Sequence, residues 1–236
     1  MVISLSIFFD SIVNAIKLII TLNPEVTEIT LLSLRVSITA VILGALIAIP
    51  IAAFISFNKF FGKKIIINLI HTFMGLPPVV VGLFVYIILS RKGFLGGLDL
   101  LYTPVAMIIA QLIMVIPIIT GVSLSAINGI SKVVKETAIS LGATKFQAAL
   151  QLIKEARYGI LTSLVTGFGA AISEVGAIIL VGGNIRFHTR ALTTAIVLET
   201  GRGNFELAMA LGLILIGMSF IINFIITHLQ QKGVKA

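Results

Sequence analysis

Five long apolar runs constrain this chain more than any other feature of its sequence. They cover about residues 36–57, 65–90, 103–122, 159–181 and 207–227. A helix needs about 20 predominantly apolar residues to cross the hydrocarbon of a bilayer, and each run reaches that length. Only 11% of the residues are charged, against about 25% in soluble domains. We therefore expect an all-α integral membrane protein with about five transmembrane helices.

Residues 1–30 form a segment with a different pattern. Ser6, Asp10, Asn14, Lys17 and Thr21 recur at steps of three or four, which places one polar stripe on an otherwise apolar helix. That periodicity is typical of an amphipathic helix lying in the membrane interface, here followed by an external segment. The alternative is a sixth membrane span whose polar stripe faces the helix bundle.

The lysines and arginines fall into two sets that alternate between the apolar runs. Ten belong to the first set: Lys59, Lys63, Lys64, Lys132, Lys135, Lys145, Lys154, Arg157, Lys232 and Lys235. Seven belong to the second set: Lys17, Arg35, Arg91, Lys92, Arg186, Arg190 and Arg202. Because cytoplasmic loops carry the excess of basic residues, the first set predicts a cytoplasmic loop at 131–157 and a cytoplasmic C-terminus. Anchoring charges beside membrane spans also explain the net charge of +8 without nucleic acid binding.

The loop at 131–157 holds the most polar stretch of the chain, KETAISLGATKFQAALQLIKEAR at 135–157. Apolar residues follow a helical spacing on both sides of Gly142: Val134, Ala138 and Leu141 before it, and Phe146, Ala149, Leu150 and Ile153 after it. Two short amphipathic helices joined at a glycine form a bent element, because glycine relaxes the backbone restriction at the corner. Their apolar faces either pack against the protein's own helix bundle or dock a soluble partner.

Several stretches resemble one family of membrane proteins. The sequence ETAISLGA at 136–143 resembles the Glu-Ala-Ala…Gly signature of the permease subunits of bacterial ABC importers, with Thr137 in place of the middle alanine. GLPPVVVG at 75–82 and SEVGA at 173–177 look like the molybdate and tungstate branch of that family. VGGNIRFHTRALTTAIVLETGRGNFELAMALG at 181–212 resembles its tungstate members most closely. The resemblance implies a type I ABC importer permease fold for a transmembrane domain at 31–230.

This family resemblance also implies a role for the loop and a set of partners. The loop would be the coupling helix that fits a groove in an ATPase, with Glu136, Thr137, Ala138, Gly142 and Ala143 as its signature residues. The family's trailing Ile-x-Leu-Pro is absent, since Leu-Ile-Lys-Glu stands at 152–155. The implied partners are a second copy of this chain in a homodimer, a dimer of a cytoplasmic ABC ATPase and an external oxyanion-binding protein, at the cell membrane. ATP and magnesium would bind to the ATPase, and no cofactor would bind to this chain.

The expected function is to form the membrane-spanning permease of an ATP-driven importer of an oxyanion, either tungstate or molybdate. Another oxyanion such as sulfate or phosphate is one alternative, and an ion channel or a secondary transporter is the alternative outside this class. The chain lacks the Gly-x4-Gly-Lys-Ser/Thr loop that binds phosphate in ATPases. Its histidines, His71, His188 and His228, lack metal-ligand spacing. We therefore expect a transporter subunit and not an enzyme.

Two places in the apolar runs are candidates for the translocation path or its gate. Pro77 and Pro78 remove two amide donors and end any helix begun before them. Carbonyls left unpaired at membrane depth are tolerated only inside protein or beside a water-filled cavity. In the fourth run, Ser173, Glu174 and Gly176 follow a stretch of small residues. We assign both places to the path or gate.

Glu174 is the only Asp, Glu, Lys or Arg within the five runs. An ionisable group at membrane depth usually has a partner. That partner is either the Arg35 side chain, at the outer end of the first run, or the backbone amides of a broken helix.

The arginines are spread unevenly, because five of the six belong to the smaller, external set. A guanidinium group binds carboxylates or oxyanions through paired hydrogen bonds. We expect Arg35 and Arg190 to dock an external partner or to guide the anion, and Arg190 is the best candidate because it lies in the tungstate-like stretch.

Overall fold

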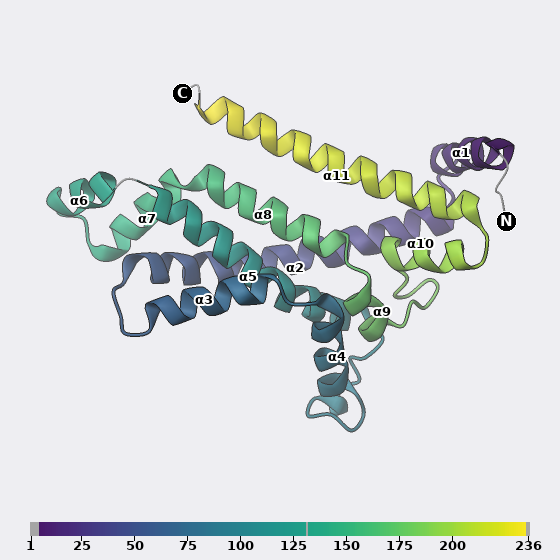
Figure 1. The fold of residues 1–236 in the computed structure, drawn as a ribbon, viewed down its shortest axis with the longest axis horizontal. Coiled ribbons are helices and arrows are strands. Elements are labelled where there is room, and N and C mark those ends of the chain that lie inside the picture. The colour runs from purple at the N-terminus through teal and green to yellow at the C-terminus, as the bar shows by residue number, and fades with distance from the viewer. Residues whose placement is uncertain (1–4, 131, 235–236) are drawn as a thin grey trace. The chain divides into compact units, whose positions relative to one another are not determined.

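The structure is a computed structural model that describes residues 5–130 and 132–234. Every regular element in these ranges is helical, in agreement with the all-α fold expected from the apolar runs (Figure 1). The elements are α1 (Leu5–Ile20), α2 (Pro24–Phe57), α3 (Lys63–Met74), α4 (Pro78–Leu89), the 3-10 turn η1 (Gly96–Leu98), α5 (Pro104–Gly129), α6 (Lys132–Ser140), α7 (Lys145–Glu155), α8 (Arg157–Ile172), α9 (Gly176–Gly182), α10 (Leu192–Gly201) and α11 (Phe205–Val234).

Helices α2, α5 and α11 are long and apolar enough to cross a membrane, and in α11 the stretch with this property is Phe205–Ile225. They contain the first, third and fifth apolar runs. The start of α5 carries a cap, because the Thr103 hydroxyl accepts a hydrogen bond from the Ala106 N–H at 3.4 Å and Pro104 occupies the first helical position. Polar capping residues therefore set where this long helix begins.

Helix α2 begins at Pro24, well before the apolar run that starts at Val36. The Asn23 side-chain oxygen accepts hydrogen bonds from the N–H groups of Glu25 at 3.0 Å and Val26 at 3.4 Å, which caps the helix. A search for apolar length alone misses a helix start of this kind. The 34 residues of α2 extend over about 51 Å, whereas the hydrocarbon of a bilayer is about 30 Å thick.

Two apolar runs are broken. The run at 65–90 is divided between α3 and α4 on either side of Pro77, as predicted. The run at 159–181, predicted as one span with a broken helix at Glu174 as one alternative, is divided between α8 and α9 around Glu174. Each pair is a broken span or a re-entrant loop, so the described residues provide from three to five spans by length and composition.

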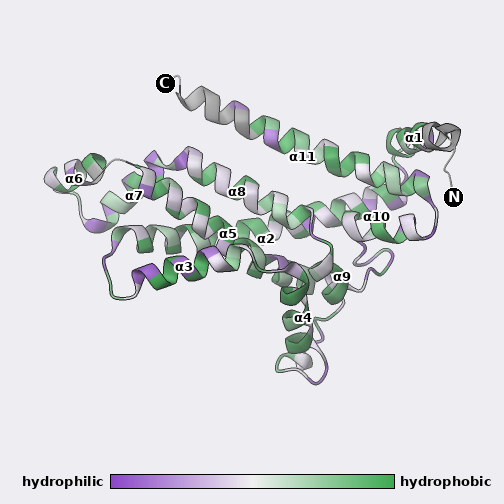
Figure 2. Cartoon of the chain, in the orientation of Figure 1, coloured by the Kyte–Doolittle hydropathy of each residue, from purple (hydrophilic) through white to green (hydrophobic). Residues whose placement is uncertain are grey.

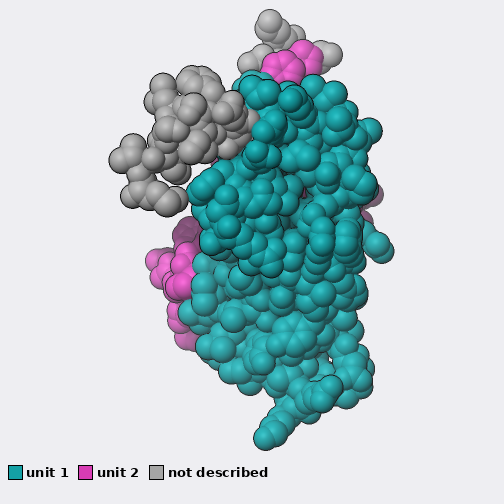
Figure 3. All heavy atoms as spheres, turned by 90° about the vertical axis from the view of Figure 1, so that its right-hand side faces the viewer, with its two compact units in different colours: residues 1–39, 78–111, 172–222 teal, residues 40–77, 112–171, 223–236 magenta. Residues whose placement is uncertain are grey.

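The chain folds into two compact units, each assembled from three separate stretches (Figure 3). Unit 1 comprises residues 1–39, 78–111 and 172–222, and unit 2 comprises residues 40–77, 112–171 and 223–236. Each unit has its own core of buried apolar residues. The unit 1 core includes Val26, Ile29, Leu192, Ala195 and Leu211, and the unit 2 core includes Ala52, Ala53, Ile55, Leu124, Ile127, Leu152, Ala156 and Ile160. Helices α2, α5 and α11 contribute residues to both units.

The division into units separates the two sets of basic residues. Within the described residues, every lysine and arginine of the larger set belongs to unit 2, and every one of the smaller set belongs to unit 1. Figure 2 shows hydrophilic residues at the starts of α3 and α8, where Lys63, Lys64 and Arg157 stand. The alternation seen along the sequence thus corresponds to a partition of the folded chain.

Two short helices complete unit 1. The predicted N-terminal helix is present as α1, and Asn14 of its polar stripe donates a hydrogen bond to Glu206 Oε1 of α11 at 2.8 Å. Helix α10 is not predicted by the apolar runs, because its 10 residues are too few to cross a bilayer. Its Leu192 and Ala195 side chains are nevertheless part of the unit 1 core.

Candidate functional site

The α6–α7 corner, residues 132–155, contains the bend predicted at Gly142. Gly142 has a φ of +86°, in the left-handed region that glycine adopts readily. The Gly142 N–H bonds to the Ile139 carbonyl at 3.0 Å, and the Ala143 N–H bonds to the Ala138 carbonyl at 3.0 Å. These bonds satisfy the last carbonyls of α6 in the pattern common at glycine-terminated helices. The predicted pair of short helices joined at a glycine is confirmed.

Helix α7 begins with a signal that its amphipathic pattern does not reveal. The Thr144 Oγ1 accepts a hydrogen bond from the Gln147 N–H at 3.3 Å, and the Gln147 Oε1 accepts one from the Thr144 N–H at 2.8 Å. This capping box, T-x-x-Q directly after the glycine corner, could have been identified from the sequence. A helix stop at Gly142 and a helix start at Thr144 therefore fix the corner by local interactions.

One face of the α6–α7 corner is anchored in unit 2 and another is exposed. Ala148 and Leu152 of α7 are buried, and Leu152 belongs to the unit 2 core. In contrast, Leu141 is 82% exposed and Phe146 is 72% exposed. Of the five signature residues, the exposed ones are Glu136, Thr137 and Gly142 and the half-buried ones are Ala138 and Ala143. The packing of one face on the protein is therefore confirmed, whereas docking of a partner on the exposed apolar side chains stays a prediction.

Glu174 lies in the break between α8 and α9, where it is 8% exposed. Its Oε1 accepts a hydrogen bond from the Ala177 N–H at 2.8 Å, so the side chain caps α9. Its main-chain carbonyl accepts a hydrogen bond from the Thr193 hydroxyl at 2.6 Å. Of the two predicted kinds of partner, the backbone amide of a broken helix is the one found.

The alternative pairing of Glu174 with Arg35 is wrong. No ion pair joins the two side chains in the part of the chain that the structure describes, and Arg35 is exposed. The physical reason is local, because the free amides at the start of α9 stand within three residues of the carboxylate and require no distant cation.

The half-helices that follow the two breaks, α4 and α9, pack closely in unit 1. A Cβ on Gly82 would lie 2.5 Å from the Ala177 Cα, and a Cβ on Gly176 would lie 2.4 Å from Val79 Cγ2. Only glycine permits this approach, because both distances are far shorter than a van der Waals contact. Of the predicted gate residues, Gly176 and Pro78 thus belong to one packed pair of helices. The remaining two, Pro77 and Ser173, are exposed.

Exposed polar side chains form stripes on two apolar helices of unit 2. On α8, Thr162 and Thr166 are exposed one turn apart, and on α3 the exposed polar residues are Asn68, His71 and Thr72. The threonine hydroxyls donate to carbonyls of the preceding turn, Thr162 to Tyr158 at 3.0 Å and Thr166 to Thr162 at 2.9 Å. The small residues of the fourth run do not indicate these positions, whereas the four-residue spacing of Thr162 and Thr166 does.

Arg190, predicted to dock an external partner or to guide the anion, is buried. It is 7% exposed, and its Nη1 lies 3.3 Å from Glu25 Oε1 and 3.7 Å from Glu199 Oε1. The role in docking or in guiding the anion stays a prediction. A guanidinium group is tolerated at this depth because two carboxylates flank it.

Two further arginines complete an ion-pair network in unit 1, formed by Glu25, Arg186, Arg190, Glu199 and Arg202. Arg186 Nε and Nη2 donate to the two oxygens of Glu25 at 2.9 and 2.8 Å, and this hydrogen-bonded carboxylate raises the pKa of Arg186 above its usual value. Arg202 Nη1 lies 3.1 Å from Glu199 Oε1. The described residues contain no group of three or more His, Cys, Asp or Glu side chains that could hold a metal ion.

Comparison with known sequences gives consistent matches over most of the chain. Residues 31–234 match a family described as the binding-protein-dependent transport system inner membrane component. A probable anion ABC transporter permease protein of Haloferax volcanii is 45% identical over 201 residues, which cover 83% of this chain and 87% of that protein. The tungstate uptake system permease protein of Peptoclostridium acidaminophilum is 40% identical over 92% of this chain and 96% of its own length. Its counterpart in Campylobacter jejuni is 32% identical over 97% and 95%.

Solved structures with a similar fold extend the comparison. A bacterial alginate ABC transporter in complex with its alginate-bound periplasmic protein matches with a TM-score of 0.75 at 21% identity, over 99% of this chain and 91% of that chain. An amino acid ABC transporter matches with a TM-score of 0.69 at 18% identity, over 91% of this chain and 96% of that chain. At these low identities the likeness concerns the fold.

Proposed function

Because this chain belongs to the binding-protein-dependent transport system inner membrane component family, matched over residues 31–234, we propose that it carries tungstate across the cell membrane as the permease subunit of an ATP-driven importer. The chain has the fold of ABC importer permeases and is a transport component rather than an enzyme. The structural observation that carries the proposal is the α6–α7 corner, which is fixed to unit 2 on one face and exposes large apolar side chains on another.

The relatives favour tungstate as the substrate. The two tungstate uptake permeases are 40% and 32% identical to this chain, whereas a sulfate transport permease of Synechocystis is 27% identical and a molybdenum transport permease of Haemophilus influenzae is 26% identical. Molybdate is the nearest alternative, because it is also a tetrahedral dianion of nearly the same size. We expect the external oxyanion-binding protein to make most of the selection between them.

The loop at 131–157 and the C-terminus face the cytoplasm in this proposal. The support is the distribution of basic residues, since cytoplasmic segments carry the excess. The α6–α7 corner then meets a dimer of an ABC ATPase, which binds ATP and magnesium, while this chain binds no cofactor. The exposed Leu141 supplies an apolar contact at the corner, and Glu136 and Thr137 supply polar contacts beside it.

The anion passes between two copies of the chain in this proposal. Polar side chains exposed on membrane helices are unfavourable against lipid, and a second copy facing the stripes on α3 and α8 would enclose them. A threonine hydroxyl can turn from its own helix carbonyl to an anion, so Thr72, Thr162 and Thr166 would provide weak, neutral donors. Weak binding suits a substrate that must be released as well as accepted.

The two breaks form the gate region in this proposal. The close packing of α4 on α9 through Gly176 is the support, because it makes one rigid contact of two half-helices that start at the breaks. Glu174 keeps the start of α9 in shape through its hydrogen bond to Ala177. Arg190 is occupied by carboxylates, so of the two predicted arginines Arg35 is the exposed one left to dock the external binding protein.

Reconstitution tests this function directly. The permease is purified with its ATPase, placed in vesicles, and supplied with the external binding protein loaded with tungstate, molybdate, sulfate or phosphate. We expect ATP hydrolysis and anion uptake to require the binding protein and to be highest with tungstate. Passive flux of ions through the permease without ATPase or ATP would instead show a channel. Stimulation by sulfate or phosphate alone would show that this anion, and not tungstate, is the substrate.

A further inference from the structure

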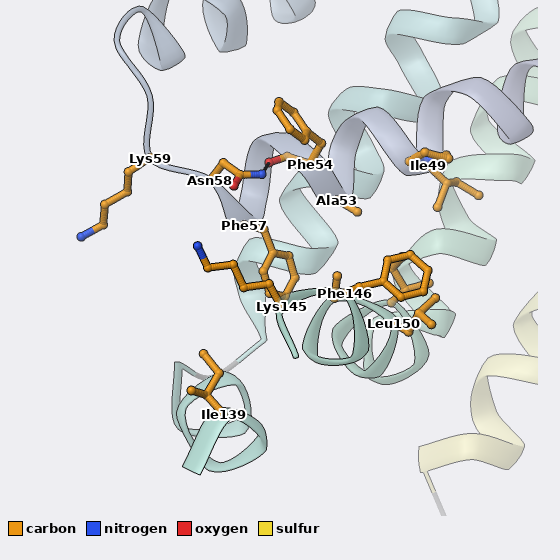
Figure 4. A pocket seen from close by; sticks show the side chains of 13 residues that line it. Ile49, Ala53, Phe54, Phe57, Asn58, Lys59, Ile139, Lys145, Phe146 and Leu150 are labelled. Atoms are coloured by element: carbon orange, nitrogen blue, oxygen red, sulfur yellow. Dashed lines mark hydrogen bonds between the residues drawn. The ribbon is translucent and has the colours of Figure 1, made fainter. Parts of the chain in front are cut away.

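Unit 2 contains a pocket of about 790 Å³ beside the α6–α7 corner (Figure 4). It lies between the C-terminal part of α2, which contributes Ile49 and Phe54, and the α6–α7 corner, which contributes Phe146 and Leu150. These side chains are accessible, since Phe54 is 62% exposed and Leu150 is 50% exposed. The volume falls within the roughly 300–1,000 Å³ of small-molecule sites.

The pocket is polar at one end and apolar at the other. In Figure 4 the side chains of Lys59 and Lys145 lie toward one side of the pocket, and Ile49, Phe146 and Leu150 lie toward the other. Two ammonium groups at one end attract an anionic group with several oxygen acceptors, such as a phosphate. The apolar end requires a hydrocarbon to cover it, so a soluble anion fills only half of this site.

Neither ammonium group is engaged elsewhere. In the described part of the chain, no side-chain hydrogen bond or ion pair involves Lys59 or Lys145. The neighbouring Lys63 behaves differently, because its Nζ donates to the carbonyls of Ser56 at 3.3 Å and Asn58 at 3.2 Å and so closes the end of α2. The two lysines of the pocket are therefore available to a ligand, and Lys63 is not.

We propose that this pocket binds one anionic phospholipid, with its phosphate between Lys59 and Lys145 and an acyl chain along Ile49, Phe54 and Leu150. Phospholipid is the occupant favoured by charge complementarity and by position, because α2 is a candidate membrane span and the pocket lies where it ends. Basic pockets between membrane helices bind anionic headgroups in this way. The orientation proposed above places this lipid in the inner leaflet, whereas the lipid site itself does not depend on transport.

Lipid retention by the intact complex tests the proposal. The permease–ATPase complex is purified from vesicles containing equal parts of phosphatidylglycerol and phosphatidylcholine, and the lipid still bound is measured by native mass spectrometry. We expect retained phosphatidylglycerol over phosphatidylcholine, and a loss of roughly tenfold in the K59Q/K145Q variant. The K64Q/K154Q variant removes the same charge from exposed lysines outside the pocket and should retain the lipid.

Leu150→Gln separates a lipid from a free phosphate compound. It should reduce phosphatidylglycerol retention while both lysines are present, and glycerol phosphate should not displace the lipid. Displacement by glycerol phosphate, or equal losses in the two lysine pairs, would overturn the proposal. The proposal would also be overturned if the K59Q/K145Q complex kept its lipid but lost the ATPase or the second permease copy. The pocket would then be a protein interface. A complex that retains the lipid but imports no oxyanion would refute the proposed function and leave this site intact.

Discussion

The two units of the chain hold their charged residues in different ways. In the described residues, the buried charged side chains are Glu174, Arg190 and Glu199, and all three belong to unit 1. Unit 2 buries hydroxyl groups instead, such as Ser123 and Ser163, which share a hydrogen bond of 2.8 Å. Unit 1 thus buries three charged side chains among partners within the chain, whereas Lys59, Lys64, Lys145 and Lys154 of unit 2 are exposed.

This difference separates two kinds of sensitivity to mutation. A change in the ion-pair network or at the close helix contacts of unit 1 should reduce stability, because the partners are buried and cannot rearrange into water. A change at the α6–α7 corner of unit 2 should leave stability nearly intact, since its exposed residues have few partners within the chain. Its effect should appear only when another protein is present.

Arg190→Met should have the largest effect on stability, because it removes a buried charge of unit 1. Removing one partner of a buried ion pair costs about 3–5 kcal/mol, and the lower end applies because Arg186 and Arg202 still neutralise the two carboxylates. The free energy of unfolding in mixed detergent micelles measures the effect. The control is Arg202→Gln, whose side chain is 58% exposed and whose loss should cost less than about 1 kcal/mol. Similar losses of unfolding free energy in both variants would show that burial does not determine the contribution of these arginines to stability.

Gly82→Ala should have the next largest effect on stability. The new Cβ would stand 2.5 Å from the Ala177 Cα, so α4 and α9 must separate, at a cost of roughly 1–3 kcal/mol. The matched control is Gly212→Ala in α11, where a Cβ meets nothing within 4 Å and helix propensity improves. Thermal unfolding should distinguish the two, and an undisturbed Gly82→Ala protein would contradict the close packing of the half-helices.

Glu174→Ala should have a smaller effect, of about 1 kcal/mol, because it removes one helix cap and leaves the Ala177 N–H without its acceptor. Glu174→Gln keeps an oxygen that can accept the same hydrogen bond and should lose less. Transport by the reconstituted complex should follow the same order, while the permease still assembles. Full transport by Glu174→Ala would rule out a role for this residue in the gate.

Gly142→Val should change coupling far more than it changes stability. No heavy atom would lie within 4 Å of the new Cβ, so the cost is the left-handed backbone strain of roughly 1 kcal/mol. A displaced α6–α7 corner should nevertheless abolish stimulation of the ATPase by the loaded binding protein. Gly142→Asn is the control, because asparagine tolerates this conformation, and it should retain most of the stimulation. Wild-type coupling by Gly142→Val would indicate that the corner serves packing alone.

Local patterns predicted the features that depend on neighbours in the sequence. The break at Pro77 and the bend at Gly142 follow from backbone chemistry that acts within one helical turn. The same principle would have predicted the caps at Asn23 and Thr144, had capping residues been sought as well as apolar length. For these features, distant contacts only support what the local sequence already favours.

Features built from distant residues were the ones predicted wrongly or missed. Arg190 meets Glu25 across 165 positions of sequence, so its burial depends on folding that no local pattern reveals. Helix α10 is held by the unit 1 core through Leu192 and Ala195 rather than by a long apolar run. The lipid pocket likewise combines the end of α2 with α7.

The chain passes between the two units in two mechanically different ways. Within α2, α5 and α11 the crossing lies inside a continuous helix, whose repeated hydrogen bonds make it a stiff rod. At Pro77 and beside Glu174 the crossing coincides with an interruption of the helix, where fewer backbone bonds resist torsion. A change of backbone torsion at either interruption therefore disturbs fewer hydrogen bonds than one within the three continuous helices.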